Sequence, residues 1–393
     1  MKKFFKSSLF FMAVAVSAVT FVSCNGGEVP DDGEKEAALK PVVEQYVNKT
    51  VIPTYKNLAD ATIELTDALV ALKADKSDAT VKAATDAWIE TRVHWEQSEA
   101  FLFGAVSDFG IDPHIDTWPL DQEQLAKELA NADRIANMEG ENGAVWVGEY
   151  LGNALLGFHG IEYVIFEKGA PKVASKINNL ELTYAIAVAG DLRNRCVQLE
   201  VAWAGEDNVT EYKMNLVEEL ELPITASNSK LSYGENMLKA GIAGSTYPSI
   251  TAATAQILDG AITIADEVGN IKIGTAANES SEDYDANHIE SPFSYNSLKD
   301  FEDNIVSIEN AYLGGPKGSR DENKSVSKYV KSKDAAVDAT VRAAIEASYA
   351  AIKAIPAPFI NNYNTAQADA AVEIIGTDLV DALKAANAII LEQ

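Results

Sequence analysis

Cysteine is nearly absent from this sequence. The 393 residues include only Cys24 and Cys196, and Cys24 directly follows an N-terminal apolar segment. With one cysteine left in the body of the chain, no intrachain disulfide can form, so stability must come from a hydrophobic core. The composition allows such a core, because 47% of the residues are hydrophobic. The same scarcity excludes CxxC redox pairs and cysteine-rich zinc sites.

Positive charge is also scarce. The chain has 32 Lys and Arg residues against 59 Asp and Glu residues, which gives a formal net charge of −27. Such a charge argues against nucleic acid as a partner and against electrostatic docking on anionic lipid. It is compatible with cationic ligands, and equally with a charge that serves only solubility.

The N-terminal apolar run is too short to cross a bilayer. It covers residues 9–22, follows three lysines in the first six residues, and ends just before Cys24. This pattern is typical of a bacterial lipoprotein signal peptide, predicted over residues 1–23, with lipid attached to Cys24. An ordinary secretory signal is the alternative. Cleavage removes the three lysines, changing the net charge from −27 to −30, and the acidic residues 24–35 would form a flexible tether.

Alternating strand patterns are scarce, and helical periodicity dominates. Apolar residues recur at three- and four-residue spacing over residues 34–72, 78–103, 334–355 and 366–392. Helices of this kind bury one apolar face against their neighbours. The sequence therefore predicts an all-α fold.

Three irregular segments interrupt the helical patterns, at residues 104–121, 274–297 and 314–325. Segments of this length in compact domains are often functional. The chain length favours two domains, and the two halves have similar layouts. We predict two domains resembling four-helix bundles, at residues 36–235 and 236–393, related by an old duplication.

The first candidate site segment is "WIETRVHWEQSE". On a helix, Trp88, Arg92, Trp95 or Glu96, and Glu99 follow one another at steps of three and four and share a face. Two tryptophans on that face indicate burial, and a buried arginine needs a partner. An Arg–Glu pair that only ties the helix to its bundle is the alternative to a role in binding.

The second segment is "DPHIDTWPLD". Asp116 and Trp118 lie between Pro113 and Pro119, in a stretch that must be extended or turning. An aspartate held in this way can orient a histidine or accept hydrogen bonds from an arginine. It can equally be a turn or capping residue.

The third segment is "GNALLGFHGIEYVIF", which contains one of only four histidines. His159 and Glu162 share a helical face at i, i+3 spacing, as metal ligands do in helical bundles. Gly157 and Gly160 flank the histidine and allow close approach of backbone or ligand. The HExxH pattern of zinc hydrolases is missing. A hydrogen-bonded His–Glu pair inside the core is the alternative.

Together and in this order, the three segments resemble the imelysin family of bacterial envelope proteins. The family's GxHxxE motif is matched by Gly157, His159 and Glu162. Its W-x3-R-x2-[aromatic]-x2-S-E segment is matched by Trp88, Arg92, Trp95, Ser98 and Glu99. The F-x-F-G pattern that follows is matched by Phe101, Phe103 and Gly104. The I-[DN]-x-W-P loop is matched by Ile115, Asp116, Trp118 and Pro119. The resemblance spans about residues 36–393. It breaks where the family has D-N-T-H-R-D, because Tyr295 and Leu298 replace an acidic residue and a histidine.

The resemblance implies two four-helix-bundle domains with the motif residues in a cleft between them. It implies an envelope protein, anchored through lipid on Cys24 to the outer membrane, that binds iron or an iron-containing ligand for uptake with an envelope transport system. A zinc-dependent metallopeptidase and a surface lipoprotein that binds carbohydrate or peptide are the alternatives. The predicted metal or ligand contacts are His159, Glu162, Glu99 and Asp116, and the predicted site-shaping residues are Arg92, Trp95, Ser98, Trp118 and Gly157.

Overall fold

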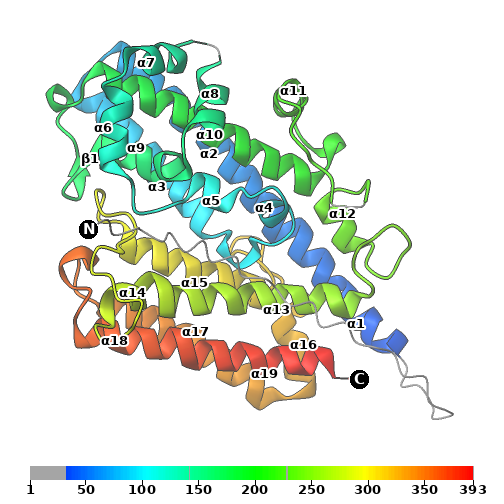
Figure 1. The fold of residues 1–393 in the computed structure, drawn as a ribbon. Coiled ribbons are helices and arrows are strands. Elements are labelled where there is room, and N and C mark those ends of the chain that lie inside the picture. Colours follow the sequence, from blue (N-terminus) through cyan, green and yellow to red (C-terminus); the bar gives the residue numbers. More distant parts are fainter. Residues whose placement is uncertain (1–31, 141, 227–228, 393) are drawn as a thin grey trace, which may run out of the picture.

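The computed structural model describes residues 32–140, 142–226 and 229–392, which are almost entirely helical (Figure 1). The prediction of an all-α fold is confirmed. Within these residues the one sheet is a hairpin of two antiparallel two-residue strands, β1 (Phe166–Glu167) and β2 (Ala170–Pro171). No described helix is both long and apolar enough to cross a membrane.

The expected signal peptide, residues 1–23, lies outside the described residues, and so does Cys24. Helix α1 (Asp32–Tyr46) begins four residues before the predicted end of the tether. Residues 32–35 are therefore helical where the sequence predicted a flexible segment.

The N-terminal half forms one layer, built around the long helices α2, α3 and α10 with the shorter α9 beside them (Figure 1). The helices of this layer and its edges are α2 (Ile52–Ala74), α3 (Asp78–Glu96), α4 (Ala105–Asp108), α5 (Asp112–Ile115), α6 (Gln122–Leu129), α7 (Ala132–Met138), α8 (Gly143–Tyr150), α9 (Gly157–Ile165), α10 (Asn179–Ala204), α11 (Glu211–Glu219) and α12 (Tyr233–Leu238).

The C-terminal half forms the second layer, in which α13, α15, α17 and α19 pack together. Its helices are α13 (Ile250–Asp266), α14 (Gly274–Ala277), α15 (Ser297–Leu313), α16 (Val326–Lys333), α17 (Ala335–Ala354), α18 (Ala366–Glu373) and α19 (Val380–Leu391). Three π-helical segments continue α1, α13 and α18: η1 (Val47–Val51), η6 (Glu267–Ile273) and η9 (Ile374–Leu379).

Helix α1 precedes the first layer in sequence but packs against α13 and α16 of the second. The Glu36 carboxylate accepts hydrogen bonds from the backbone N–H groups of Ile250 (2.7 Å) and Thr251 (3.0 Å). Glu36 thereby satisfies donors that the start of α13 would otherwise leave unpaired. The first helix of the chain thus packs on the second layer, and the layers are not simply the two halves of the sequence. The division into domains at residues 235 and 236 stays a prediction, as does an old duplication.

Local sequence signals explain where the helices around the site begin and end. Ser77 and Asn178 form capping boxes at the starts of α3 and α10, with Thr80 and Glu181 as their partners. Helix α15 ends at Leu313 and is followed by Gly314, whose φ of +87° is a left-handed conformation favourable to glycine. These short-range interactions set the ends of α3 and α15, which carry Arg92 and Asp300, and the start of α10, which packs against α9.

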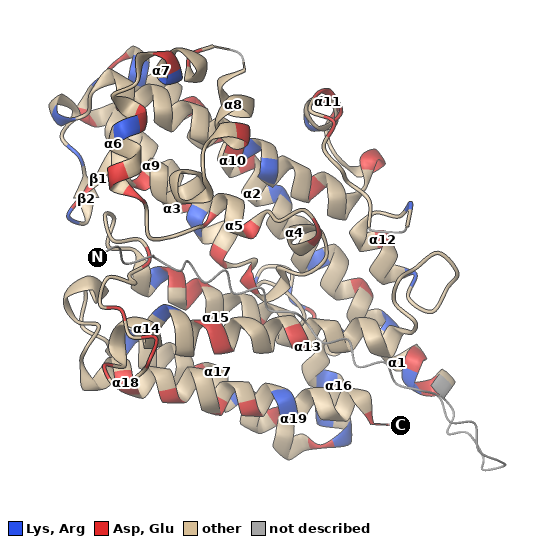
Figure 2. Ribbon diagram, viewed as in Figure 1, with Lys and Arg blue, Asp and Glu red and all other residues tan. Residues whose placement is uncertain are grey.

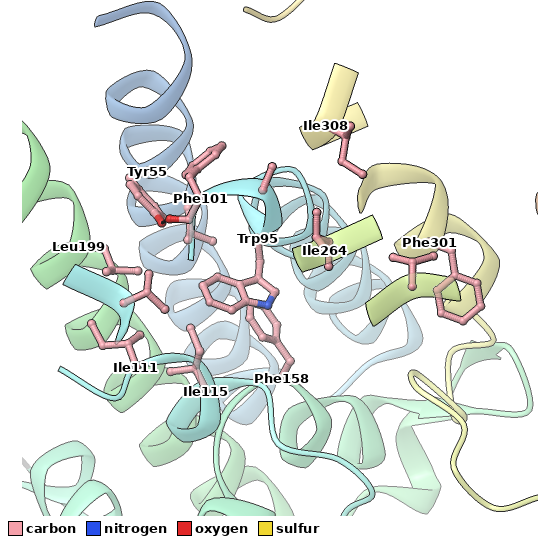
Figure 3. Close-up of a cluster of buried hydrophobic side chains, with 14 of the residues drawn as sticks. Tyr55, Trp95, Phe101, Ile111, Ile115, Phe158, Leu199, Ile264, Phe301 and Ile308 are labelled. Atoms are coloured by element: carbon pink, nitrogen blue, oxygen red, sulfur yellow. Dashed lines mark hydrogen bonds between the residues drawn. The ribbon is translucent and has the colours of Figure 1, made fainter. Parts of the chain in front are cut away.

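One continuous core joins the two layers. Figure 3 shows Trp95 and Phe158 at its centre, with Tyr55 and Leu199 of the first layer on one side and Ile264 of α13 on the other. The Trp95 and Phe158 rings lie 6.3 Å apart between centroids, and both side chains are fully buried. Burial of each such side chain contributes on the order of 2 kcal/mol to stability. The layers therefore meet through hydrophobic packing around Trp95.

Segment η6 crosses η9 in backbone contact. A Cβ atom on Gly269 would lie 2.3 Å from the backbone nitrogen of Gly376. Only a residue without a side chain allows that approach. The crossing fixes the position of η6, which carries Lys272 into the seam between the layers.

We predict that Gly269→Ala lowers the free energy of unfolding by about 1–3 kcal/mol, because the added methyl group meets backbone that must move. Gly318→Ala is the matched control, since nothing lies within 4 Å of a Cβ atom there. Urea denaturation of both variants tests the prediction. Equal stability of the two variants would contradict it.

Candidate functional site

A buried guanidinium lies at the centre of the seam. Arg92, on α3, is fully buried and forms ion pairs with four carboxylates. Its terminal nitrogens lie 2.5 Å from Glu96 and 2.6 Å from Glu290, and a third contact reaches Asp116. Its Nε atom lies 3.5 Å from Asp300. Three of these partners lie outside α3, and two of those, Glu290 and Asp300, belong to the second layer.

A second buried cation, Lys272, enters from η6. Its Nζ lies 3.2 Å from Glu290, 3.5 Å from Glu96 and 3.6 Å from Glu99. Glu290 Oε1 thus lies between the two fixed cations, because Arg92 contacts the same oxygen. The side chain of Lys272 is 2% exposed. An uncompensated charge at such depth is strongly unfavourable, so the two cations hold these carboxylates in place.

Negative charge is in excess within this cluster. The acidic members are Glu96, Glu99, Asp116, Glu162, Glu290 and Asp300, and all are buried. Arg92, Lys272 and a charged His159 would offset three of the six charges. Acidic residues also outnumber basic ones over both layers of the molecule (Figure 2). The cluster therefore has to hold protons or an additional cation.

The pKa values in the cluster reflect this imbalance. Burial raises the pKa of Glu96 and Glu99 well above their usual range, more than Arg92 and Lys272 lower them. Burial also raises the pKa of Asp300 to about 7. Asp116 is the exception, because Arg92 overcomes the effect of burial and its pKa is lowered. Asp116 is thus an ionised ligand candidate near neutral pH.

The His159–Glu162 pair begins at a sharp turn. Gly157 opens α9 with a φ of +67°, and a Cβ atom there would lie 1.6 Å from the carbonyl oxygen of Ile115. The start of α9 therefore lies directly against the end of α5, one residue before Asp116. This contact brings the loop aspartate within 3.2 Å of His159, between Oδ1 and Nε2.

Glu162 holds the histidine from the other side. Its Oε2 lies 3.0 Å from His159 Nδ1. Its Oε1 accepts hydrogen bonds from the backbone N–H of Phe293 (3.0 Å) and of Ser294 (2.8 Å), and from the Ser294 hydroxyl (2.7 Å). Both carboxylate oxygens are thus engaged. Glu162 orients the imidazole and ties it to a loop of the second layer.

Two buried atoms beside the histidine remain without a hydrogen-bond partner among the described residues. They are Glu290 Oε2 and His159 Nε2, which lies 3.2 Å from Asp116 Oδ1 as an ion-pair contact without hydrogen-bond geometry. Donor atoms of His159, Asp116 and Glu290 all lie within 4.8 Å of one another, close enough to hold one metal ion. A histidine whose other nitrogen is fixed by a carboxylate is the usual arrangement at metal sites. The residues present therefore fit a metal with one nitrogen and two oxygen ligands.

Protonation of His159 competes with such an ion. Burial alone would lower its pKa, but contacts with Asp116 and Glu162 outweigh burial and raise the pKa to about 9. Without an ion, the imidazolium itself supplies positive charge to the cluster. Metal binding at Nε2 would displace that proton.

The other predicted site residues fall into two groups. Trp95 donates from Nε1 to Asp116 Oδ2 (2.7 Å), and Glu99 faces Lys272, so both belong to the cluster. Ser98 instead donates its hydroxyl to the Trp95 carbonyl at the end of α3. Trp118 packs against His288, with 3.9 Å between ring centroids.

Glu290, Lys272 and the role of Asp300 were missed by the sequence analysis. Glu290 lies in the irregular segment 274–297, where no periodicity marks a buried residue. Lys272 carried a weak signal, since it stands alone between two isoleucines in "NIKIG". Asp300 lies at the end of the run that departs from the family pattern. The sequence analysis left the glutamate partner of Arg92 open, and the structure shows it to be Glu96, one turn along the same helix.

The geometry defines a class: all-α proteins with two helical layers that share a buried cluster of histidine, carboxylates and arginine. The model of the imelysin family matches residues 51–390, which is most of the chain. The chain therefore belongs to the imelysin family, as the sequence motifs predicted.

Known relatives agree with this assignment. The chain is 26% identical over 283 residues to iron-regulated protein A of Synechococcus elongatus, covering 72% of this chain and 67% of that protein. A Parabacteroides distasonis crystal structure, provisionally described as an iron-regulated protein A precursor, superposes with a TM-score of 0.74 and 30% identity, covering 90% of this chain and 95% of that one. An imelysin-like protein of Psychrobacter arcticum shares the fold, with a TM-score of 0.56, 15% identity, and coverage of 95% and 96%.

We predict that Arg92→Met lowers the free energy of unfolding by about 3–5 kcal/mol, because several buried carboxylates lose their fixed counter-charge. Lys82→Met is the control, since the Lys82–Asp86 pair is well exposed, and its effect should stay within about 0.5 kcal/mol. Urea denaturation at pH 7 measures both. A loss below 1 kcal/mol for Arg92→Met would show that the cluster does not depend on this cation.

The raised pKa of His159 predicts a pH dependence of stability. A histidine that binds its proton more tightly when folded stabilises the protein below pH 6.5, and this contribution is lost as the pH rises through about 9. The difference in unfolding free energy between wild type and His159→Gln should therefore be about 3 kcal/mol larger at pH 6 than at pH 9.5. His94→Gln is the control, because burial lowers the pKa of His94 and gives no such loss above pH 7.

Proposed function

We propose that this protein binds iron in the bacterial cell envelope and takes part in iron uptake. The observation that carries the proposal is the arrangement around His159. Its Nδ1 atom is held by Glu162, while Nε2 faces the carboxylates of Asp116 and Glu290 without a hydrogen bond of its own among the described residues. Such a set is prepared to bind a cation.

The type of donor favours iron over zinc. One imidazole and two carboxylates form a hard, oxygen-rich set that suits iron, whereas catalytic zinc sites usually have more nitrogen or sulfur ligands. The excess of acidic groups, six buried carboxyl groups around the two fixed cations Arg92 and Lys272, also favours a cation. The names of the relatives, which describe iron-regulated proteins, support the same choice.

A metallopeptidase has less support. Peptide hydrolysis requires that a substrate reach the metal, and His159, Asp116 and Glu290 are at most 7% exposed. No observation within the described residues favours a carbohydrate- or peptide-binding function at this cluster. The proposal therefore assigns the cluster to binding of an ion.

The sequence and the names of the relatives support a location in the cell envelope. The lipoprotein signal pattern before Cys24 supports an outer-membrane anchor, facing the periplasm or the cell exterior. An anchored binding protein would transfer its iron to an envelope transport system. The acidic surface agrees with a preference for cationic cargo.

Calorimetric titration of residues 25–393 tests the proposal. Fe(II) under anaerobic conditions, Fe(III) and Zn(II) are titrated into wild type, His159→Ala, Glu290→Gln and Glu162→Gln. We expect tight iron binding by wild type, loss of binding in the first two variants, and weakening of about tenfold in Glu162→Gln, since the imidazole loses its orienting carboxylate. His94→Ala, which leaves the cluster intact, should bind like wild type.

Iron affinity should also rise with pH between about 6 and 9, because binding displaces a proton from His159. Absence of iron binding by wild type, or equal binding by wild type and His159→Ala, would overturn the proposal. Selective binding of zinc, with peptide hydrolysis that a chelator stops, would instead support the peptidase.

A further inference from the structure

A cavity of about 600 Å³ lies beside the cluster, between the two layers. Its walls come from the end of α9, the β1–β2 hairpin and residues 286–295 of the second layer. The aromatic rings of Tyr163, Phe166, Phe293 and Tyr295 line it, and the Tyr163 and Phe293 rings meet edge to face with centroids 5.2 Å apart. This volume and lining are typical of sites for small organic ligands.

The charge of the cavity is opposite to that of the protein as a whole. Lys168 and Lys172 line it, and its one acidic side chain, Glu167, is paired with Lys176 at 2.5 Å. Lys172 is held in place, because its Nζ donates to the Tyr163 carbonyl (2.7 Å) and lies 5.0 Å from the centre of the Tyr163 ring. In a chain of net charge −27, a cavity with two available lysines favours an anion.

The hairpin that carries the lysines is fixed to the second layer. Lys168 and Gly169 have φ values of +53° and +79°, the conformation of a tight two-residue hairpin turn. The N–H of Gly169 donates to the Phe293 carbonyl (2.9 Å). A Cβ atom on Gly169 would lie 2.4 Å from the Tyr295 ring, so the ring packs directly on the turn. The cavity is therefore built from both layers and does not depend on a loose loop.

The cavity and the cluster share structural elements. Tyr163 follows Glu162 in sequence, and the backbone N–H of Phe293 donates to Glu162 Oε1. A ligand in the cavity would thus contact the same residues that hold the carboxylate of the His159–Glu162 pair. The cluster itself is buried, so a bulky ligand fits the cavity and not the cluster.

We propose that this cavity binds a small aromatic anion of the arene carboxylate or catecholate class. The rings of Tyr163, Phe293 and Tyr295 contact the arene, and Lys168 and Lys172 pair with its oxygens. The link to iron rests on the proposed function: such oxygen donors chelate iron, and the cavity would hold the organic part of an iron chelate next to the cluster that receives the ion.

The test uses purified protein and 2,3-dihydroxybenzoate as the probe, without metal and as its Fe(III) complex. Calorimetry compares wild type with the double variant Lys168→Glu/Lys172→Glu. We expect micromolar binding of both probes by wild type and at least a tenfold loss in the double variant. The double variant Lys328→Glu/Lys331→Glu, an equal change of charge at two exposed positions of α16, should leave binding unchanged.

Further arms separate this inference from the proposed function. His159→Ala should keep its affinity for metal-free 2,3-dihydroxybenzoate, because the cavity remains intact. If wild type binds bare iron but not the metal-free probe, the cavity proposal fails and the proposed function stands. If the probe binds but bare iron does not, the proposed function fails and the cavity proposal stands. Unchanged probe binding by the lysine double variant, or equally tight binding of citrate, would also overturn the cavity proposal.

Discussion

The burial of Arg92 is the constraint on which the arrangement of the two layers depends. A guanidinium removed from water must be surrounded by carboxylates, and Arg92 takes them from its own helix, from the loop after α5 and from the second layer. The layers cannot separate at this seam without exposing or unpairing a charge. Hydrophobic packing around Trp95 brings the layers together, and the ion pairs of Arg92 set their register.

The same ion pairs fix the carboxylates around His159, where we propose that an ion binds. Fixed cations and donors hold these carboxylates: Glu290 Oε1 lies between Arg92 and Lys272, while Asp116 is held by Arg92 at Oδ1 and by the Trp95 indole N–H at Oδ2. Asp116 Oδ1 also lies 3.2 Å from His159 Nε2, and Glu290 Oε2 has no hydrogen-bond partner among the described residues. Such preorganisation reduces the ordering that binding would otherwise require. The acidic excess that makes the cluster retain protons also favours a bound cation.

Glu162 connects the site to its surroundings. One of its oxygens orients His159, and the other is held by the backbone of Phe293 and Ser294. The loop that contains Phe293 also forms a wall of the cavity and accepts the hydrogen bond of the β1–β2 hairpin. The histidine, the loop and the cavity wall are thus connected by hydrogen bonds through Glu162 and Phe293, across both layers.

The sequence by itself determined the all-α fold, the family and more than half of the cluster. Helical periodicity is local, and Arg92, Trp95, Asp116, His159 and Glu162 stand in motifs short enough to recognise. The tertiary structure alone decided their partners. Glu290 and Lys272 come from irregular or π-helical segments about 200 residues from Arg92, where no local pattern marks burial. A buried charge pairs with the opposite charges that lie close to it in space. Which groups lie close is decided only when the two layers pack.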